Sequence, residues 1–229
     1  TSITVSEPAA LVASSSATDI LCNGGTATVT VSAVGGTTPY SGDGTFTVSA
    51  GTHNYTVTDA NGCTSSTSIT VTEPAALVAS STQGAAILCN GGTTTVTVSA
   101  IGGTTPYSGD GTFTVTAGTY NYTVTDANGC TSSTSITVSE PAALVASSSA
   151  TDILCNGGTA TVTVSAVGGT APYSGDGSFT VTAGTYSYTV TDANGCTSST
   201  SITVSEPAAL VASSSATDIL CNGGTATVT

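Results

Sequence analysis

Seven cysteines recur along the chain in two series, and they are the residues best suited to covalent chemistry. One series is Cys22, Cys89, Cys155 and Cys221, and the other is Cys63, Cys130 and Cys196. Two thiols can be oxidised to a disulfide when their Cα atoms approach to about 5.5 Å. A bond within a repeat would close a somewhat longer loop than a bond across a repeat boundary. Chain entropy does not favour either pairing, since the stabilisation expected from closing the two loops differs by only about 0.5 kcal/mol.

Strand geometry favours one pairing of these cysteines. Cys22 and Cys63 precede different strands, so in an up-and-down sandwich their turns lie at opposite ends, roughly 26 Å apart for a typical strand. End-to-end stacking of repeats would instead bring together the pairs Cys22–Cys130 and Cys89–Cys196, which is our hypothesis. The alternative within each repeat stays open because sequence does not define connectivity; it would pair Cys22–Cys63, Cys89–Cys130 and Cys155–Cys196.

Aspartates and the single histidine are the other candidates for chemistry. Six aspartates lie in glycine-rich turns, where a carboxylate can bind Ca²⁺ weakly or accept hydrogen bonds from the turn backbone; they are Asp43, Asp59, Asp110, Asp126, Asp176 and Asp192. No Asp-x-Asp-x-Asp pattern occurs, so turn chemistry is the favoured interpretation. His53 is replaced by Tyr120 and Tyr186 in the other repeats. No catalytic residue, metal site or cofactor is therefore predicted.

Short strands must position these residues, because apolar and polar side chains alternate along several runs. Residues 26–34 and 45–50 alternate cleanly, and turns rich in Gly and Asn separate the runs. Five to seven such strands predict an all-β fold, a tandem array of small immunoglobulin-like β-sandwich modules of about 66 residues. The residues expected in the core of the first module are Val29, Val31, Phe46, Val48, Tyr55, Val57, Ile69 and Val71.

A repeat of about 66 residues organises the whole chain, and a period this long suits one small domain per repeat. Residues 8–73 and 141–206 differ at only six positions. The predicted organisation is the last strand of a preceding truncated module at 1–7, modules at 8–73, 74–140 and 141–206, and the start of a following truncated module at 207–229. Module hinges are expected at Glu7 and Pro8, Glu73 and Pro74, Glu140 and Pro141, and Glu206 and Pro207.

The charge of the chain argues against several classes of partner. It has 13 acidic residues and neither Lys nor Arg, for a net charge of −13. Without cations to neutralise phosphates, nucleic-acid binding is not expected. No apolar run reaches the roughly 18 residues that a membrane span needs, so no membrane insertion is expected for this segment. The expected partners are neighbouring modules of the same chain, with lateral self-association or surface polysaccharide as alternatives.

Several motifs recur at fixed spacing in every repeat. They are Cys22-Asn-Gly-Gly, Gly35-Gly36-x-x-Pro39-Tyr40, Asp59-Ala-Asn-Gly-Cys63 and Glu73-Pro74. Together they resemble the SprB-type repeat of Bacteroidetes surface proteins. The resemblance implies an extracellular location at a bacterial cell surface and a place in a very large adhesin, which in some species serves gliding motility. Family members usually continue Pro-Tyr into a longer strand, whereas here Ser41-Gly42-Asp43-Gly44 follows directly and predicts a shortened third strand.

The sequence therefore predicts a structural stalk segment of a large extracellular adhesin or filament, and not an enzyme. One alternative is a self-assembling extracellular filament or sheath protein. Another is a repeat that binds polysaccharide, although the chain has only 8 Tyr and no Trp on which sugars could stack.

Overall fold

The computed structural model describes all residues from Thr1 to Thr229, and its regular structure consists of antiparallel β-strands. The all-β, sandwich-like fold expected from the sequence is confirmed. The first five strands are β1 (Val12–Ala17), β2 (Ala27–Val34), β3 (Gly44–Val48), β4 (Gly51–Thr58) and β5 (Thr64–Val71). Ten more follow with matching lengths: β6 (Val78–Gln83), β7 (Thr94–Ile101), β8 (Gly111–Val115), β9 (Gly118–Thr125), β10 (Thr131–Val138), β11 (Val145–Ala150), β12 (Ala160–Val167), β13 (Gly177–Val181), β14 (Gly184–Thr191) and β15 (Thr197–Val204).

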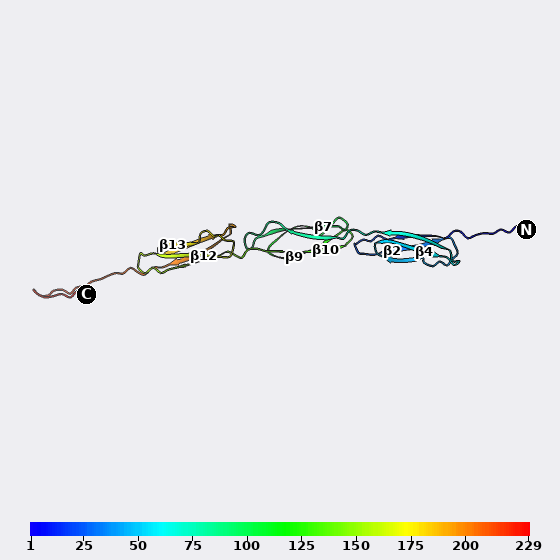
Figure 1. Ribbon diagram of the computed structural model, residues 1–229. Helices are drawn as coiled ribbons and strands as arrows, with labels where there is room; N and C mark the ends of the chain where they lie inside the picture. The colour runs from blue at the N-terminus through cyan, green and yellow to red at the C-terminus, as the bar shows by residue number, and fades with distance from the viewer. The chain divides into compact units, whose positions relative to one another are not determined.

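Each group of five strands forms a three-stranded and a two-stranded sheet. In the first group the orders are β1-β2-β3 and β4-β5, and Figure 1 labels β2 and β4, one from each sheet. The register pairs Val29 with Phe46 and Tyr55 with Thr67. Because side chains alternate across a strand, this register places the apolar residues of β2 and β4 on the faces that meet.

The core of the first group is built mainly from valine. Val29 and Val57 are fully buried, and the buried set also includes Ile20, Ala27, Val31 and Val71. The other core residues expected from the sequence are partly buried and pack against this set: Phe46, Val48, Tyr55 and Ile69. The rings of Phe46 and Tyr55 lie 4.7 Å apart and join the two sheets. Burial of one valine contributes about 1.5 kcal/mol or more, so these few side chains account for much of the stability of so small a unit.

Hydroxyl groups close the edge of the sandwich between its first and last strands. The Ala13 backbone N–H on β1 donates to the Ser65 hydroxyl at 3.0 Å, and the Ser15 and Thr67 hydroxyls lie 2.9 Å apart. These pairs advance together along both strands, so β1 and β5 run side by side in the same direction. The opposite edge carries an isolated bridge between Ser41 and Thr58 in place of a longer strand, as the short segment after Tyr40 predicts.

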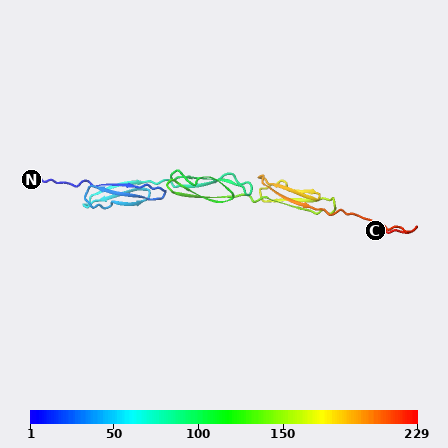
Figure 2. The ribbon, with the colours of Figure 1, turned by 180° about the vertical axis from the view of Figure 1, so that it is seen from behind.

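By packing, the chain divides into two compact units. The first contains Thr1–Ala86 and Thr93–Val138, and the second contains Ile87–Gly92 and Ser139–Thr229. The short segment 87–92 belongs with the second unit because the Asn90 side chain donates to the Glu140 carboxylate at 3.0 Å and Cys89 is bonded to Cys196. In the first unit, residues 1–7 are exposed and extend away from the strands, as the view from behind shows (Figure 2). The chain offers no helix with the length and hydropathy that a membrane crossing requires.

Candidate functional site

The turn at Cys22 is held by the acidic residue that ends its own module. The Gly25 N–H donates to the Cys22 carbonyl at 3.0 Å, which closes the turn, and Gly24 adopts a φ of +76° that favours glycine. The Gly24 N–H donates to the Glu73 carboxylate at 2.6 Å, and the Asn23 side chain donates to the Pro74 carbonyl at 3.1 Å. The sequence predicts a hinge at Glu73 and Pro74, but these contacts tie the step to the loop that presents Cys22.

The turn at Cys130 is organised around the buried carboxylate of Asp126. One oxygen accepts the Thr104 N–H at 2.9 Å, and the other accepts the N–H groups of Asn128 at 2.9 Å and Cys130 at 2.8 Å. Burial by itself raises the pKa of Asp126, but these backbone donors outweigh it and hold the pKa below the ordinary value. Asp59 and Asp192 make the same contacts with the same direction of pKa shift.

Within the first unit these two turns meet, and we call their contact the first joint. Cys22 and Cys130 form a disulfide with a Cα–Cα distance of 5.7 Å across a sequence separation of 108 residues. The Asn128 side-chain amide donates to the Leu21 carbonyl at 3.2 Å and to the Thr104 hydroxyl at 3.0 Å. Ala76 and Leu77 line a pocket of about 360 Å³ beside this bond. The first joint thus combines one covalent bond with a hydrogen bond that orients the incoming loop.

A second joint with the same chemistry lies within the second unit. Cys89 is bonded to Cys196, again with a Cα–Cα distance of 5.7 Å. The Asn194 amide donates to the Leu88 carbonyl at 3.2 Å, and the Gly91 N–H donates to the Glu140 carboxylate at 2.7 Å. The two pairs are those of the inter-repeat hypothesis, and the alternative within repeats is not the arrangement in the structure.

Three cysteines remain as free, exposed thiols: Cys63, Cys155 and Cys221. Cys63 occupies the position of Cys130, with its N–H bound to Asp59 at 2.8 Å. Cys155 occupies the position of Cys22, and its turn is held in the same way because the Gly157 N–H donates to Glu206 at 2.7 Å. The free thiols therefore sit in turns that are already shaped like those of the joints.

The six aspartates considered as Ca²⁺ ligands fall into two structural classes. Asp59, Asp126 and Asp192 are buried, and both oxygens of each accept backbone N–H groups, which is turn chemistry. Asp43, Asp110 and Asp176 are exposed in the glycine-rich turns before β3, β8 and β13. The structure brings no group of three or more His, Cys, Asp or Glu side chains together as a metal site would require.

His53 has the same structural role as the tyrosines that replace it. Its Nε2–H donates to the Ser49 carbonyl at 2.9 Å. The Tyr120 hydroxyl donates to the Thr116 carbonyl at 3.1 Å, and the Tyr186 hydroxyl to the Thr182 carbonyl at 3.0 Å. The histidine is therefore one of two residue types that tie the start of β4 and its equivalents to the preceding turn.

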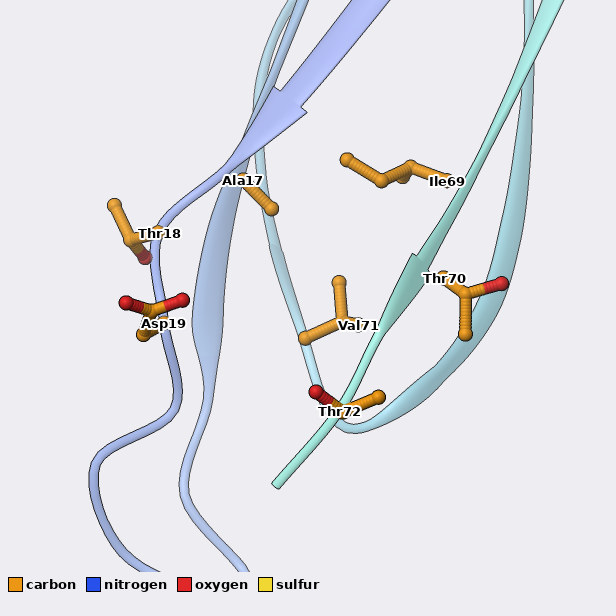
Figure 3. A pocket seen from close by; sticks show the side chains of 7 residues that line it. All are labelled: Ala17, Thr18, Asp19, Ile69, Thr70, Val71 and Thr72. Atoms are coloured by element: carbon orange, nitrogen blue, oxygen red, sulfur yellow. The ribbon is translucent and has the colours of Figure 1, made fainter. Parts of the chain in front are cut away.

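A shallow pocket of about 180 Å³ lies between the ends of β1 and β5 (Figure 3). Its lining combines Ala17, Thr18 and Asp19 with Ile69, Thr70, Val71 and Thr72. A corresponding pocket lies beside Asp152 and Val204 in the second unit. Asp19 is the only charged side chain in the lining of the first pocket, so the joints remain the better candidates for a functional site.

Sequence reasoning misses two residues that build the joints. It assigns Glu73 only to a hinge, and it does not single out Asn128. The sequence does contain a signal for both residues, because the motifs that hold them are the same in every repeat: Glu-Pro follows the last strand and Asp-Ala-Asn-Gly-Cys precedes it.

In comparison with known proteins, the chain matches no protein-family model and no curated protein.

Proposed function

We propose that the chain is a tension-bearing segment of a large extracellular repeat protein at a bacterial surface, where it serves as a structural stalk for adhesion or gliding. Two disulfides support an oxidising environment, since such bonds persist mainly outside the cytosol. The resemblance of the motifs to SprB-type repeats supports the surface location and the adhesin role. The observation that carries the proposal is the position of the disulfides along the chain.

The two disulfides shorten the covalent route along the chain, because each links residues more than 100 positions apart and leaves most of a module outside that route. Cys130 leads through β10, the Glu140-Pro141 step and β11 to Cys155, without entering the rest of either module. In the same way Cys63 leads through β5 and β6 to Cys89, and the disulfide then passes tension to Cys196. The segment between Cys89 and Cys130, which includes β7, β8 and β9, lies outside both paths.

The strands that carry these paths are neighbours in the sandwich. The Ala79 N–H on β6 donates to the Ser132 hydroxyl on β10 at 3.0 Å, and the Ser81 and Thr134 hydroxyls lie 3.0 Å apart. As with β1 and β5, the two strands run in the same direction. A load applied along the chain would therefore act parallel to both strands, and it would not separate one strand from the other.

Force spectroscopy on the whole chain tests the proposal. The free thiols of Cys63 and Cys221 serve as attachment points for thioether-linked handles, with Cys155→Ser to remove the third thiol. In the oxidised chain the covalent path crosses the Cys89–Cys196 bond, so its fully stretched length is limited to roughly 180 Å. Reduction opens the continuous path from Cys63 to Cys221, which reaches roughly 550 Å. An oxidised chain that stretches as far as the reduced one overturns the load-bearing role.

Location is tested separately on intact source cells with a fluorescent antibody fragment against the repeat. Label on unpermeabilised cells is the expected result, and label that appears only after permeabilisation contradicts the surface role. Label that travels along the cell body assigns the segment to motility, and label fixed in place assigns it to a static stalk or sheath.

A further inference from the structure

Asn-Gly pairs occur twice in every repeat, and one of them directly follows a cysteine of the Cys22 series. At the two joints these pairs are Asn23-Gly24 and Asn90-Gly91. In such a pair the glycine nitrogen can attack the preceding side-chain amide, because glycine has no Cβ to hinder the approach. Loss of ammonia by this route converts asparagine to aspartate or isoaspartate, so both joints contain a site at which the chain could change covalently.

At the second joint, one carboxylate binds both nitrogens that this reaction involves. The Gly91 N–H, which belongs to the attacking nitrogen, donates to Glu140 Oε2 at 2.7 Å. The side-chain amide of Asn90, which would leave as ammonia, donates to Glu140 Oε1 at 3.0 Å and to the Pro141 carbonyl at 3.1 Å. Both hydrogens of that amide are therefore engaged, and the side chain cannot turn toward Gly91 without breaking hydrogen bonds.

The charge of Glu140 opposes the reaction as well. The Gly91 nitrogen must give up its proton as it attacks, so negative charge develops on that nitrogen. A carboxylate beside it disfavours this charge, because like charges repel. The attack would also break a hydrogen bond to a charged acceptor, which is stronger than one between neutral groups. Geometry and charge thus both protect Asn90 while Glu140 is in place.

The first joint has the same arrangement. The Gly24 N–H donates to the Glu73 carboxylate at 2.6 Å, and the Asn23 side-chain amide donates to the Pro74 carbonyl at 3.1 Å. The third module repeats both contacts. The Glu-Pro step that ends each module therefore covers the Asn-Gly pair of the same module.

We propose that Asn23 and Asn90 are latent deamidation sites, which Glu73 and Glu140 protect and which react when the carboxylate is drawn away from the turn. The glycine nitrogen bonds to the asparagine Cγ as the Cγ–Nδ2 bond breaks, and the glycine N–H proton leaves with the side-chain nitrogen as ammonia. Water then opens the cyclic imide on either side, which gives aspartate or isoaspartate. This inference goes beyond the stalk role and rests only on the contacts of these turns.

The modification would alter the turn permanently. Asn90 is exposed, so water has access to the cyclic imide. An aspartate in its place has no N–H to donate to the Pro141 carbonyl, and its charge would repel Glu140. Isoaspartate also routes the main chain through Cβ directly beside Cys89. A turn that reacts while it is open therefore cannot regain its original contacts.

Two reciprocal variants of the whole oxidised chain test the proposal, Glu140→Gln and Glu73→Gln. Glutamine is neutral and has a single acceptor oxygen, so it cannot bind both nitrogens as the carboxylate does. During incubation at mildly alkaline pH, peptic peptides analysed by mass spectrometry report deamidation at each site. We expect Glu140→Gln to speed the reaction of Asn90 at least several-fold without affecting Asn23, and Glu73→Gln to do the reverse. The proposal fails if Asn90 reacts no faster in Glu140→Gln, or if it reacts in the unaltered folded chain as fast as in the reduced, denatured chain.

A second Asn-Gly pair in the same unit separates local protection from general unfolding. The Gly195 N–H donates to the Asp192 carbonyl at 3.0 Å, and no contact links this turn to Glu140. Asn194 should therefore keep its original rate in Glu140→Gln, and equal acceleration of Asn90 and Asn194 would overturn local protection. Asp152→Asn is the matched control, because it removes one exposed carboxylate from the same unit and should leave every rate unchanged.

Discussion

The Asp126 carboxylate accepts the backbone N–H of Cys130 at 2.8 Å, while the Cys130 sulfur is bonded to Cys22. One buried acid thus shapes the turn that places a sulfur for a cross-link to a residue 108 positions away. The same relationship joins Asp192 to Cys196 and, at a free thiol, Asp59 to Cys63. The hydrogen bonds of the buried aspartate therefore position the cysteine that forms the disulfide.

Counting free thiols distinguishes the two disulfide patterns. The structure leaves three free cysteines, Cys63, Cys155 and Cys221. We expect a freshly purified, monomeric chain to react with three equivalents of a thiol reagent under denaturing, non-reducing conditions. Pairing within repeats would leave only Cys221, so a single equivalent would contradict the arrangement.

Stability should fall at acid pH because of the buried aspartates. The pKa values of Asp59, Asp126 and Asp192 are lowered in the folded chain, so their ionised forms stabilise it. This contribution is fully present above the unfolded pKa of about 4 and is lost as the pH falls through the lower folded values. We expect the Tm to hold steady from pH 7 to about 5 and to drop below about 4.

A matched pair of variants tests whether the loss of stability at acid pH comes from the buried aspartates. Asp59→Asn should lower the Tm of the first unit at pH 7 and weaken its dependence on acid, because the neutral amide cannot accept with both atoms. Asp43→Asn, at an exposed turn, should leave both unchanged. A flat Tm profile down to pH 2 would show that the buried carboxylates do not govern acid stability.

Two glycines in left-handed conformation should differ sharply in their tolerance of alanine. A Cβ at Gly35 (φ +76°) would lie 2.0 Å from the Ala10 carbonyl oxygen, so the backbone must move. Gly62 (φ +85°) has nothing within 4 Å of that position. We expect Gly62→Ala to cost about 1–2 kcal/mol from backbone strain alone and Gly35→Ala to cost about 3 kcal/mol or more because overpacking adds to it. Urea unfolding followed by hydrogen exchange in residues 8–73 measures both, and equal costs would contradict the close approach.

Core packing can be tested with valines of opposite exposure. Val57 is fully buried, whereas Val34 is 67% exposed. Val57→Ala should destabilise by about 1.5–3 kcal/mol through lost burial and a small cavity, and Val34→Ala by less than about 0.5 kcal/mol. Similar losses of unfolding free energy in the two variants would be inconsistent with a core centred on Val57.

The Glu73 carboxylate should control how readily the first joint forms. Glu73→Gln removes the charge that accepts the Gly24 N–H, so the loop bearing Cys22 should be held less firmly. Re-oxidation of the reduced chain, followed by peptide mapping of Cys22–Cys130, should be slower in this variant. Glu7→Gln is the control, because Glu7 is exposed and not bound to a cysteine loop. If Glu7→Gln slowed re-oxidation as much as Glu73→Gln, the contact between Glu73 and Gly24 would not be what controls formation of the first joint.

The strands and most of the core are predictable because their signal is local. Alternating Val and Thr in residues 27–34 identify both the strand and its buried face, and the structure buries Val29 and Val31 there. The strand at Val12–Ala17 is the hardest to anticipate, since Ser14, Ser15 and Ser16 interrupt the alternation. Its place beside β5 depends on hydroxyl contacts with residues 52 positions away.

The sequence by itself determined the turns and the all-β class, because these follow from residues close together in the chain. It also determined the period and which cysteines stand in equivalent positions, because these follow from comparing one copy of the repeat with the next. The tertiary structure decided which aspartates are buried acceptors and which are exposed, although Asp43 and Asp59 both lie in glycine-rich turns. It also chose the cysteine partners among the possible pairings and gave Glu73 its contact with Gly24. A disulfide or a capping hydrogen bond depends on distance through space, and local sequence patterns do not encode the distance between residues 49 to 108 positions apart.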